Sequence, residues 1–447
     1  MESNDILFKF LYPKRIAVIG ASRNPNKVGR IVFENLLQSG KEVIPINPNA
    51  EEITGIKCYP SVLDYPKEID LAVICVRNFI VPKVLEECGK KGIKAVIIIS
   101  AGFSEAGNQE LEKELIEIAN KYGIKFLGPN CFGIVFPKEK LNTTFMKLKI
   151  KEGKAAFISQ SGALGAGLLQ KFEREGIGIY AFISVGNQAV LTLEDWIRFF
   201  DKTDCSGVAV YMESTKNGRV FLDTLKQSKK KIFILKAGRT EKGSKAALTH
   251  TGAITTQDIL YTAAIKQAKK VRVDSLEELV NLIYFLSFYE EISGKRVVVV
   301  TNSGGPAVIL TDELESAGLE LIDLPKPLLD SLNKILPPRW SHSNPIDLTG
   351  DATPERFKRV FELLQQHANL FNILICILTP LQMTQPMEVA KLLGEFKEKT
   401  GKMVIANFIG VKKEVIDLLE RKNIPNFELP ELISKTLKYL AQYTKYE

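Results

Sequence analysis

Residues 16–30 read IAVIGASRNPNKVGR, and this stretch carries the clearest fold signal of the chain. Its first four residues are apolar, which predicts a short buried strand over 16–19. Gly20 then allows a sharp turn, and a helical pattern follows over 32–38. A strand that turns at a glycine into a helix is the opening unit of doubly wound folds, which bind ligands at such turns. The stretch therefore predicts an α/β fold with a ligand-binding loop after its first strand.

The same alternation of strand and helix continues along the chain. Short runs rich in Val and Ile are separated by longer stretches with helical periodicity, such as 81–90. This rhythm predicts parallel sheets with helices on both faces. The expected further strands are residues 42–46, 71–76, 95–99, 155–158, 180–184, 207–211, 231–236, 296–300, 373–378 and 403–407.

Two turns divide the chain into three expected domains. The turn GPNCFG at 128–133 interrupts the first series of strands, and Ser293-Gly294-Lys295 separates the second series from the third. A chain of 447 residues has room for roughly three domains of about 150 residues. The expected domains are residues 1–128, 129–293 and 294–447.

The second and third expected domains look like copies of one another. One strand runs into the turn Ser161-Gly162, and another runs into Ser303-Gly304. The helical stretches that follow end at Gly176 and Gly318, and both pairs of positions are 142 residues apart. A gap-free match over strand, turn, helix and final glycine favours domain duplication, although common βα units can also coincide by chance.

Composition narrows the class of protein. Lys and Arg exceed Asp and Glu by eight, and 45% of residues are hydrophobic, which is ordinary for a globular protein. The six cysteines show no CxxC spacing, so we expect neither a disulfide framework nor a metal site, and a reduced cytoplasm suits them.

The distribution of apolar and basic residues excludes two kinds of partner. No apolar run approaches the ~20 residues of a membrane span, and the first residues do not resemble a signal peptide, so we expect no membrane and a cytoplasmic location. Basic residues form no tail and no basic–aromatic stripe, so we expect no nucleic acid. A small polyanionic substrate suits the mild positive charge.

The loop over 20–30 is the first candidate site. Its exposed amides and the following helix N-terminus suit a pyrophosphate, and Arg23, Lys27 and Arg30 add positive charge. The spacing is not G-x-G-x-x-G, which argues against a nicotinamide site. A plain glycine turn with solvated basic side chains is the alternative, and the residues alone leave both open.

The two strand-to-helix turns SQSGALG (159–165) and TNSGGPA (301–307) are the second candidate site. Each places backbone amides and short hydroxyls at a helix N-terminus, where the helix dipole favours an anion. Two such turns facing one another would hold a phosphoryl group; the alternative is a pair of helices capped by serine. The candidate phosphate-binding residues are Ser161, Gly162, Ala163, Gly304 and Gly305.

His250 is the third candidate, because a neutral imidazole can accept a phosphoryl group near neutral pH. It lies between two threonines in a stretch rich in Gly and Thr, whereas His367 has a polar, surface-like setting and His342 lies in a loop. Glu213, at the end of the strand VAVYME, is a candidate to orient the ring. The alternatives are a loop histidine without a catalytic role and a strand-end carboxylate that only caps or is solvated.

Eight motifs follow one another along nearly the whole chain: GASRNPNKVGR, INPN, SAGFSEAG, GPNCFG, SQSGALG, SVGN, KAGRTEKGSKAALTHTGA and TNSGGPAVILTD. Together they resemble the NDP-forming acyl-CoA synthetases, above all the alpha subunits of ADP-forming acetate–CoA ligases, with succinyl-CoA synthetase as a more distant relative. The resemblance implies an N-terminal Rossmann-like CoA-binding domain followed by two flavodoxin-like domains of the succinyl-CoA synthetase type. It also implies the reaction acyl-CoA + ADP + phosphate ⇌ acid + ATP + CoA.

The resemblance also implies roles for the candidate residues. An acyl phosphate forms first, and its phosphoryl group passes to a histidine on a mobile loop and then to ADP. His250 matches that histidine, Glu213 the glutamate that orients it, and the Ser-Gly turns the helices that cradle the phosphoryl group. Thr249 stands where the family usually has Ser, which keeps the hydroxyl. The residues that match the CoA site are Gly20, Ser22, Arg23 and Lys27 at its diphosphate and Asn47 near its nucleotide end.

Nothing in the sequence resembles the ATP-grasp unit that binds ADP and Mg²⁺ in this family. The resemblance therefore implies a separate ATP-grasp beta subunit that mainly supplies the ADP/ATP and Mg²⁺ site, in a heterotetramer of two alpha and two beta chains. The substrates on this chain would be a small carboxylic acid, phosphate and CoA. The motifs do not determine which acyl group is preferred, whether ADP or GDP is used, or the direction of flux.

Two other functions fit parts of the sequence less well. A CoA-sensing regulatory module would tend to lose the catalytic histidine, and His250 is present. A nicotinamide dehydrogenase would rest on the first domain alone, and the missing G-x-G-x-x-G counts against it.

Overall fold

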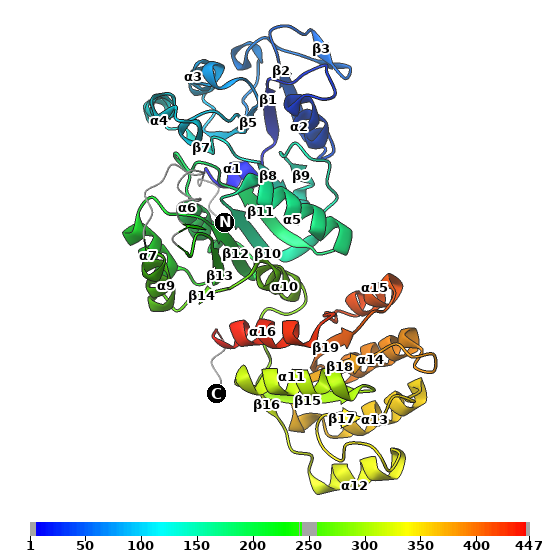
Figure 1. The fold of residues 1–447 in the computed structure, drawn as a ribbon. Helices are drawn as coiled ribbons and strands as arrows, with labels where there is room; N and C mark the ends of the chain where they lie inside the picture. The colour runs from blue at the N-terminus through cyan, green and yellow to red at the C-terminus, as the bar shows by residue number, and fades with distance from the viewer. Residues whose placement is uncertain (1–5, 241, 244–256, 444–447) are drawn as a thin grey trace. The chain divides into compact units, whose positions relative to one another are not determined.

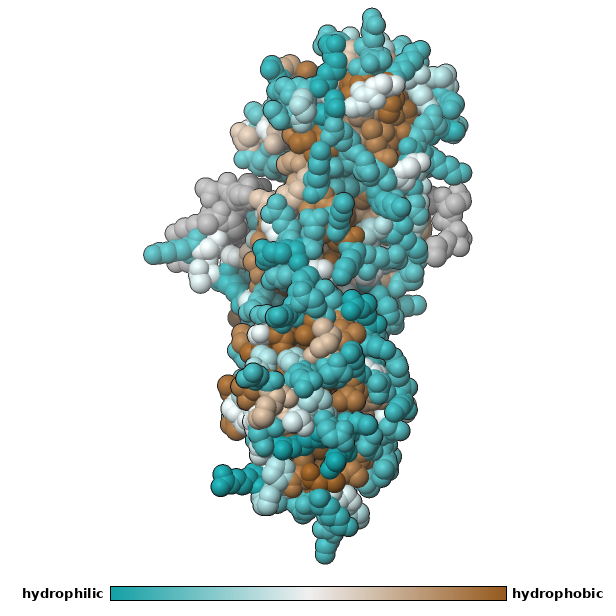
Figure 2. All heavy atoms as spheres, turned by 90° about the vertical axis from the view of Figure 1, so that its right-hand side faces the viewer, coloured by the Kyte–Doolittle hydropathy of each residue, from teal (hydrophilic) through white to brown (hydrophobic). Residues whose placement is uncertain are grey.

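The computed structural model describes residues 6–240, 242–243 and 257–443. The chain forms two compact units, Met1–Leu279 and Val280–Glu447. The first unit holds two large α/β sheets and the second holds one (Figure 1). The strands are buried, and hydrophilic side chains cover most of the face drawn in Figure 2, with apolar atoms showing between them. Among the described helices, none is both long and apolar enough to cross a membrane.

The first sheet has five parallel strands in the order β2-β1-β5-β6-β7. Helix α2 covers one face, where Val32 and Phe33 share a core with Val18 of β1, and α3 and α4 cover the other face (Figure 1). The strands are therefore hydrophobic on both faces. The elements of this part are α1 (Phe8–Leu11), β1 (Arg15–Ile19), α2 (Val28–Leu37), β2 (Glu42–Ile46), β3 (Glu52–Ile53), β4 (Ile56–Lys57), β5 (Leu71–Ile74), α3 (Val81–Lys91), β6 (Ala95–Ile98), α4 (Gln109–Tyr122) and β7 (Lys125–Leu127).

The strand order of this sheet reverses at β1. Strand β2 lies on one side of β1, and β5 lies on the other. Doubly wound sheets bind ligands at such a switch point, in the crevice at the carboxyl ends of the two diverging strands. Gly20 follows β1 and Cys75 follows β5, so the loop that the sequence singles out lies at the switch point.

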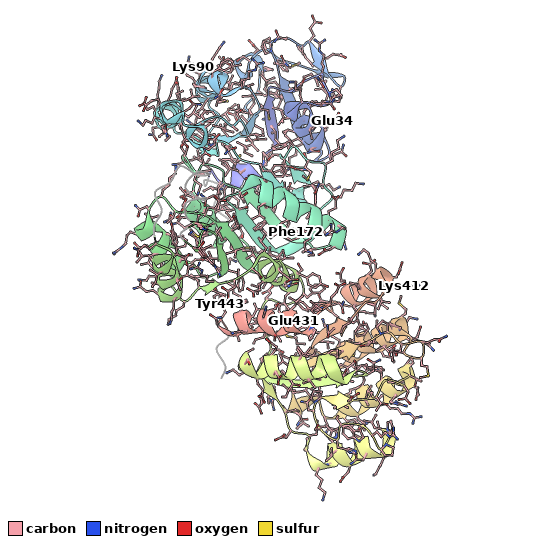
Figure 3. The ribbon with its side chains drawn as sticks, in the orientation of Figure 1. Glu34, Lys90, Phe172, Lys412, Glu431 and Tyr443 are labelled. Atoms are coloured by element: carbon pink, nitrogen blue, oxygen red, sulfur yellow. The ribbon has the colours of Figure 1, made fainter. Side chains whose placement is uncertain are left out.

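The second sheet has the order β14-β13-β12-β10-β11-β8-β9, with five parallel strands and an antiparallel hairpin, β8–β9, at one edge. Helix α5 packs on it through Phe172, whose ring centroid lies 6.3 Å from that of Phe157 on β10 (Figure 3). The sequence patterns did not predict the hairpin, because its strands are too short to show a periodicity. The elements are β8 (Ile134–Phe136), β9 (Leu141–Asn142), β10 (Glu152–Ser159), α5 (Gly162–Glu175), β11 (Ile179–Ser184), α6 (Leu193–Phe200), β12 (Gly207–Met212), α7 (Gly218–Gln227), β13 (Lys231–Lys236), α9 (Asp258–Gln267) and β14 (Val271–Arg272).

The second unit is built on the sheet β16-β15-β18-β19, with β17 also paired to β15. The two units divide at Leu279, inside α10, and the expected domain boundaries at 128 and 293 stay predictions. The elements are α10 (Leu276–Leu286), β15 (Arg296–Thr301), α11 (Gly304–Ser316), β16 (Glu320–Leu321), α12 (Lys326–Ile335), β17 (Ile346–Asp347), α13 (Pro354–Gln366), β18 (Ile373–Leu378), α14 (Pro386–Thr400), β19 (Met403–Phe408), α15 (Lys413–Arg421) and α16 (Pro430–Ala441).

The second and third sheets pair their strands in matching register. Ala155 of β10 lies opposite Gly207 of β12, and Val297 of β15 lies opposite Ile373 of β18. Ala155 and Val297 keep the 142-residue offset of the Ser-Gly turns. Strands β13 and β19 extend the two sheets in the same way. The duplication expected from the turns is thus confirmed over three adjacent strands in each copy.

Candidate functional site

A cavity of about 620 Å³ lies in the first unit, at the carboxyl ends of β5 and β6. Cys75 and Val76, just after β5, and Val28, the first residue of α2, line it from the N-terminal part of the chain. Ser161, Gly162 and Ala163, at the start of α5, line it from the second sheet. The first predicted phosphate turn therefore borders this cavity, whereas the predicted CoA loop reaches it only through Val28 and the predicted residues Gly20, Ser22, Arg23, Lys27 and Asn47 are not among its lining.

Two glycines bring helix α2 against the turn after β1. Gly20 has a φ of +90°, and a Cβ atom there would lie 2.9 Å from the Cys75 carbonyl oxygen. A Cβ atom on Gly29, in the first turn of α2, would lie only 2.0 Å from the Gly20 carbonyl oxygen. Such contacts leave no room for a side chain, so glycine is needed at both positions. Sequence reasoning missed the role of Gly29, because its spacing from Gly20 belongs to no standard fingerprint.

Side chains tie the loops after β1 and β2 together. The Asn47 side chain donates to the Ala21 carbonyl at 2.7 Å, and Arg23 Nη2 donates to the Asn49 carbonyl at 3.3 Å. Ser22 Oγ accepts from the Asn24 amide at 3.1 Å, which folds the loop back on itself. The structure thus brings the predicted residues Ser22, Arg23 and Asn47 to one end of the sheet.

Positive charge is available at this loop. Arg23 and Lys27 are both exposed, and Lys27 immediately precedes α2. The first amides of α2 have no partner within the helix, and its dipole favours an anion there. The loop therefore offers charge and hydrogen-bond donors to a diphosphate.

Ser161 begins α5 as its N-cap, and its Oγ accepts from the Leu164 amide at 3.3 Å. Ser161 therefore caps the helix, as the alternative interpretation of this turn expects. Gly162 next to it is hemmed in, since a Cβ atom there would lie 3.2 Å from Cβ of Phe132. Capping uses one acceptor and leaves the amides of the first turn directed at the cavity end of the helix.

Gln160 connects this turn to Glu213. Its Oε1 accepts from the amides of Glu213 and Ser214 at 2.8 and 3.0 Å, and its Nε2 donates to Ser214 Oγ at 3.2 Å. The Tyr211 hydroxyl donates to Glu213 Oε1 at 3.4 Å. Burial and the adjacent Glu213 carboxylate raise the pKa of Tyr211 to about 12. Sequence reasoning missed Gln160, although its partner in the repeat, Asn302, was a usable signal.

The second copy repeats this bonding. Asn302 Oδ1 accepts from the Thr379 amide at 2.9 Å, just after β18, as Gln160 does just after β12. Thr301 Oγ1 donates to the Ser303 carbonyl at 2.8 Å, as Ser159 Oγ donates to Ser161 at 2.7 Å. Thr379 thus takes the place of Glu213, and this copy has no carboxylate at that position.

Gly304 and Gly305, the predicted phosphate-binding residues of the second copy, begin α11 in the second unit. Ser303 makes no side-chain cap bond there. A Cβ atom on Gly304 would lie 3.3 Å from an oxygen of the Asp347 side chain, so a carboxylate already borders this turn.

His250 lies outside the described residues, but the elements on either side of its segment, β13 and α9, are described. Lys236, the last residue of β13, is buried with its Nζ 4.7 Å from the centre of the Tyr261 ring on α9. Burial lowers the pKa of Lys236. The Tyr261 hydroxyl accepts from the Thr215 amide at 3.2 Å, two residues beyond Glu213. Lys236 and Tyr261, which stand on either side of the undescribed segment, contact each other, and Tyr261 is bonded to the segment that carries Glu213.

Side chains that could bind a metal ion do not cluster in the described residues. Within the described parts of the chain, no group of three His, Cys, Asp or Glu residues is gathered closely enough to hold a metal ion. All six cysteines lie in described parts and are free thiols.

Three protein families match successive parts of the chain. Residues 14–137 match a CoA binding domain, 152–286 a succinyl-CoA ligase like flavodoxin domain, and 297–422 a Ligase-CoA domain. The fold and cavity thus define a CoA-binding α/β protein of the succinyl-CoA ligase type.

Comparison with whole proteins is more specific. The acetate–CoA ligase (ADP-forming) II alpha subunit of Pyrococcus furiosus is 40% identical over 98% of this chain and 97% of that protein. The acetate–CoA ligase (ADP-forming) of Methanocaldococcus jannaschii is 43% identical over 99% of this chain, but over 64% of its own length. The chain belongs to the NDP-forming acyl-CoA synthetase family.

A solved structure supports the same assignment. The dinucleotide-forming acetyl-coenzyme A synthetase 1 of Ca. Korarchaeum cryptofilum, in complex with phosphate and ADP, matches with a TM-score of 0.91 and 37% identity. The match covers 98% of this chain and 96% of that chain. The α/β fold expected from the sequence, with a CoA-binding domain followed by flavodoxin-like domains, is confirmed.

Proposed function

We propose that this chain is the alpha subunit of an ADP-forming acyl-CoA ligase, which interconverts acyl-CoA, ADP and phosphate with acid, ATP and CoA. The observation that carries this proposal is a cavity bordered by both Val28, at the end of the Gly20 loop, and the start of α5. A diphosphate on the loop and a phosphate at the helix would bring the thioester and its attacking oxygen into one space. The relatives reported above are acetate–CoA ligases, which supports the same reaction.

In the first step, the chain aligns phosphate with the thioester. The amides of Gly162 and Ala163 and the dipole of α5 hold the phosphate. A phosphate oxygen attacks the carbonyl carbon, the C–S bond breaks, and sulfur leaves as the CoA thiolate. The product is an acyl phosphate. Arg23 and Lys27 hold the CoA diphosphate, so much of the catalysis is positioning.

In the second step, His250 takes over the phosphoryl group. Its neutral ring nitrogen attacks phosphorus, the P–O bond to the acyl group breaks, and the acid leaves as a carboxylate. Glu213 orients the ring and stabilises its positive charge, because a carboxylate accepts the hydrogen bond of the other ring nitrogen. Gln160 fixes the backbone of Glu213 relative to the phosphate turn. A transfer of this kind needs positioning and charge more than covalent machinery.

The third step requires a partner. We infer that an ATP-grasp beta subunit mainly supplies the site for ADP/ATP and Mg²⁺, in a heterotetramer of two alpha and two beta chains. The name "subunit alpha" of the Pyrococcus relative supports a partner chain. The greater length of the Methanocaldococcus relative, of which this chain covers 64%, supports a further part on the same chain in other members.

Phosphohistidine formation tests the assignment of His250. The full chain, incubated with acyl-CoA and radiolabelled phosphate, should acquire an adduct that is labile in acid and stable in base. His250→Ala should abolish the label, whereas His367→Ala should leave it unchanged, because His367 ends α13 in the other unit. Equal labelling of the His250→Ala variant would refute the assignment.

Calorimetry with CoA and NAD tests the class of cofactor. We expect CoA to bind and Arg23→Ala to weaken it, because an exposed charge on the diphosphate loop is lost. Binding of NAD without a response to CoA would favour the dehydrogenase alternative.

A further inference from the structure

The proposed function fixes which part of the ligand occupies the cavity. Phosphate at the start of α5 can attack only if the thioester carbonyl lies next to Ser161–Ala163. The acyl chain then extends into the remaining cavity, between the GPNCFG turn and residues 145–146. The chemistry of these walls therefore decides which acyl groups fit, a question that the motifs leave open.

The walls of the cavity are mostly apolar, and the polar side chains among them, Ser100, Asn130, Gln160 and Ser161, are uncharged. None of the described residues that line it carries a charge. Phe132 and Phe145 meet edge to face with ring centroids 4.6 Å apart, and Met146 lies beside them on the lining. Cys131 also lines the cavity, and burial raises the pKa of its thiol to about 12, so the thiol stays neutral.

The segment that carries Phe145 is held by its backbone and not by its side chain. Asn35 of α2 donates to the carbonyls of Thr144 and Met146 at 2.8 and 2.9 Å. Asn142 Nδ2 donates to the Met146 carbonyl at 2.9 Å. The Phe145 side chain itself is 37% exposed. Truncating it should remove part of the cavity wall and leave the segment in place.

A charged acyl group would be penalised in this space. Moving a carboxylate out of water without a counter-charge or full hydrogen bonding is costly. A methylene group placed against the apolar wall instead gains about 0.8 kcal/mol, which is about fourfold in affinity. Ala166 on α5 contributes only a methyl group to the wall, so a larger side chain there would reduce the space of the cavity.

We propose that the cavity selects uncharged, apolar acyl groups bulkier than acetyl and discriminates against dicarboxylic acyl groups, with Phe145 as the residue that favours the larger acyl chain. Ala166 on α5 sets the limit of size, because a larger residue there would fill the space. This inference rests on the proposed function, which brings CoA thioesters to the cavity.

Calorimetric titration of the full chain with CoA, acetyl-CoA, butyryl-CoA and succinyl-CoA tests the proposal. Butyryl-CoA has two methylenes more than acetyl-CoA, so we expect it to bind about tenfold more tightly when both are buried. Succinyl-CoA has the same chain length with a terminal carboxylate, and we expect it to bind at least about tenfold more weakly than butyryl-CoA.

Two variants change the wall in opposite ways. Phe145→Ala should lower the ratio of butyryl-CoA to acetyl-CoA affinity at least about threefold, because apolar contact is lost. Ala166→Leu should weaken butyryl-CoA more than acetyl-CoA, because it fills the space. Leu63→Ala is the matched control, since Leu63 is 45% exposed in the same unit and does not line the cavity. It should leave every ratio unchanged.

The outcomes separate the two proposals. If CoA and its thioesters all fail to bind, the proposed function is wrong and the selectivity falls with it. If CoA binds but acetyl-, butyryl- and succinyl-CoA bind equally, the function stands and the selectivity is wrong. Unaltered ratios in both the Phe145→Ala and Ala166→Leu variants would overturn the roles of these residues, and a failure of one variant to fold leaves the other decisive.

Discussion

At the scale of single residues, the contact between Gly29 and the Gly20 carbonyl fixes where the CoA loop lies. It lets helix α2 begin directly against the turn after β1, so that its free amides border the switch point of the sheet. The positive φ of Gly20 serves the same approach from the strand side. Two residues without side chains thus decide the geometry of a charged site.

Gly29→Ala should be strongly unfavourable. A Cβ atom 2.0 Å from a backbone oxygen forces the helix away from the strand, and overpacking of this kind costs about 1–3 kcal/mol. We expect a lower free energy of unfolding in urea and weaker CoA binding. Gly167→Ala is the control, because Gly167 lies in helix α5 with no atom within 4 Å of an added Cβ. That variant should be slightly stabilised, since alanine favours helix, and a similar loss in both variants would contradict the contact argument.

Tyr289 gives the second unit a dependence on alkaline pH. Its hydroxyl donates to the Val404 carbonyl at 2.9 Å and accepts from the Val404 amide at 3.0 Å, at the edge of β19. Burial raises its pKa to about 12. Because the pKa is higher in the folded state than the ordinary value near 10, the neutral hydroxyl stabilises the fold fully below about pH 10. This contribution is lost as the pH rises toward 12.

Urea unfolding between pH 9 and 11.5 measures this effect. The wild-type chain should lose stability over this range more steeply than Tyr289→Phe, which keeps the ring beneath Lys397 Nζ at 4.6 Å and removes only the hydroxyl. Tyr12→Phe, at a tyrosine 37% exposed in the first unit, should follow the wild type. Parallel curves for wild type and Tyr289→Phe would exclude the proposed role.

Local sequence patterns predict some features of the site, but they do not predict contacts between segments that are distant in the sequence. The charge of Arg23 and Lys27 and the helix-start amides at Ser161 follow from local pattern. The close approach at Gly29 and the bond from Gln160 to Glu213 do not, because each depends on how two distant segments pack. The cavity wall is still less predictable, since its residues come from several separate loops.

At the scale of elements, the two copies differ mainly in one connection. Gly238 and Arg272 are 34 residues apart in the first copy, and Gly410 and Asn426 are 16 apart in the second, although Arg272 and Asn426 hold equivalent places beside the preceding strand. The first copy therefore carries 18 additional residues, which include His250. The structure places this difference between a strand and the helix that follows it, β13 and α9 in the first copy and β19 and α15 in the second.

Replacing residues 239–257 with Val-Lys, the link that the second copy uses at 411–412, tests whether the extra residues serve only the reaction. We expect the chain to fold, because β19 and α15 are joined by the same short link. CoA affinity should change by less than about twofold, since the replacement alters none of the residues proposed to bind the CoA diphosphate. Phosphohistidine labelling should disappear. Loss of the unfolding transition would show that the segment is also needed for stability.

Short strands escaped prediction, whether parallel or antiparallel, and long ones did not. The predicted parallel strands have four to eight residues and are largely apolar, which marks them in the sequence, whereas the parallel strands β7, β14, β16 and β17 have only two or three. The hairpin β8–β9 has strands of three and two residues and follows a turn that signals only a break. It nevertheless leads directly into the segment that carries Phe145, so the unpredicted element is the one that shapes the cavity.

At the scale of the whole molecule, the first unit contains the loop proposed to bind CoA, the cavity, the Ser161 turn and the elements on either side of the segment that carries His250. It therefore holds the residues proposed for making the acyl phosphate and accepting its phosphoryl group. The residues proposed here for this half of the reaction do not include a nucleotide site. This division of labour makes the two half-reactions separable in an experiment.

Partner dependence follows from that division. The purified chain should be labelled by acyl-CoA and phosphate, yet form no ATP from ADP until an ATP-grasp beta chain is added. A coupled luciferase assay measures ATP, with the His250→Ala chain plus beta chain as the control that should remain silent. Formation of ATP by the chain alone would show that the nucleotide site is its own.

The apolar wall next to the start of α5 bears on more than the choice of acid. An acyl phosphate is a mixed anhydride, and stray hydrolysis would waste the bond that the thioester cleavage conserved. In the proposed reaction, a lining that is uncharged and mostly apolar would hold fewer ordered water molecules, so that the intermediate would persist longer before His250 accepts its phosphoryl group. The hydrophobic side chains proposed to set the acyl preference would thereby also reduce the hydrolysis of acyl phosphate during each turnover.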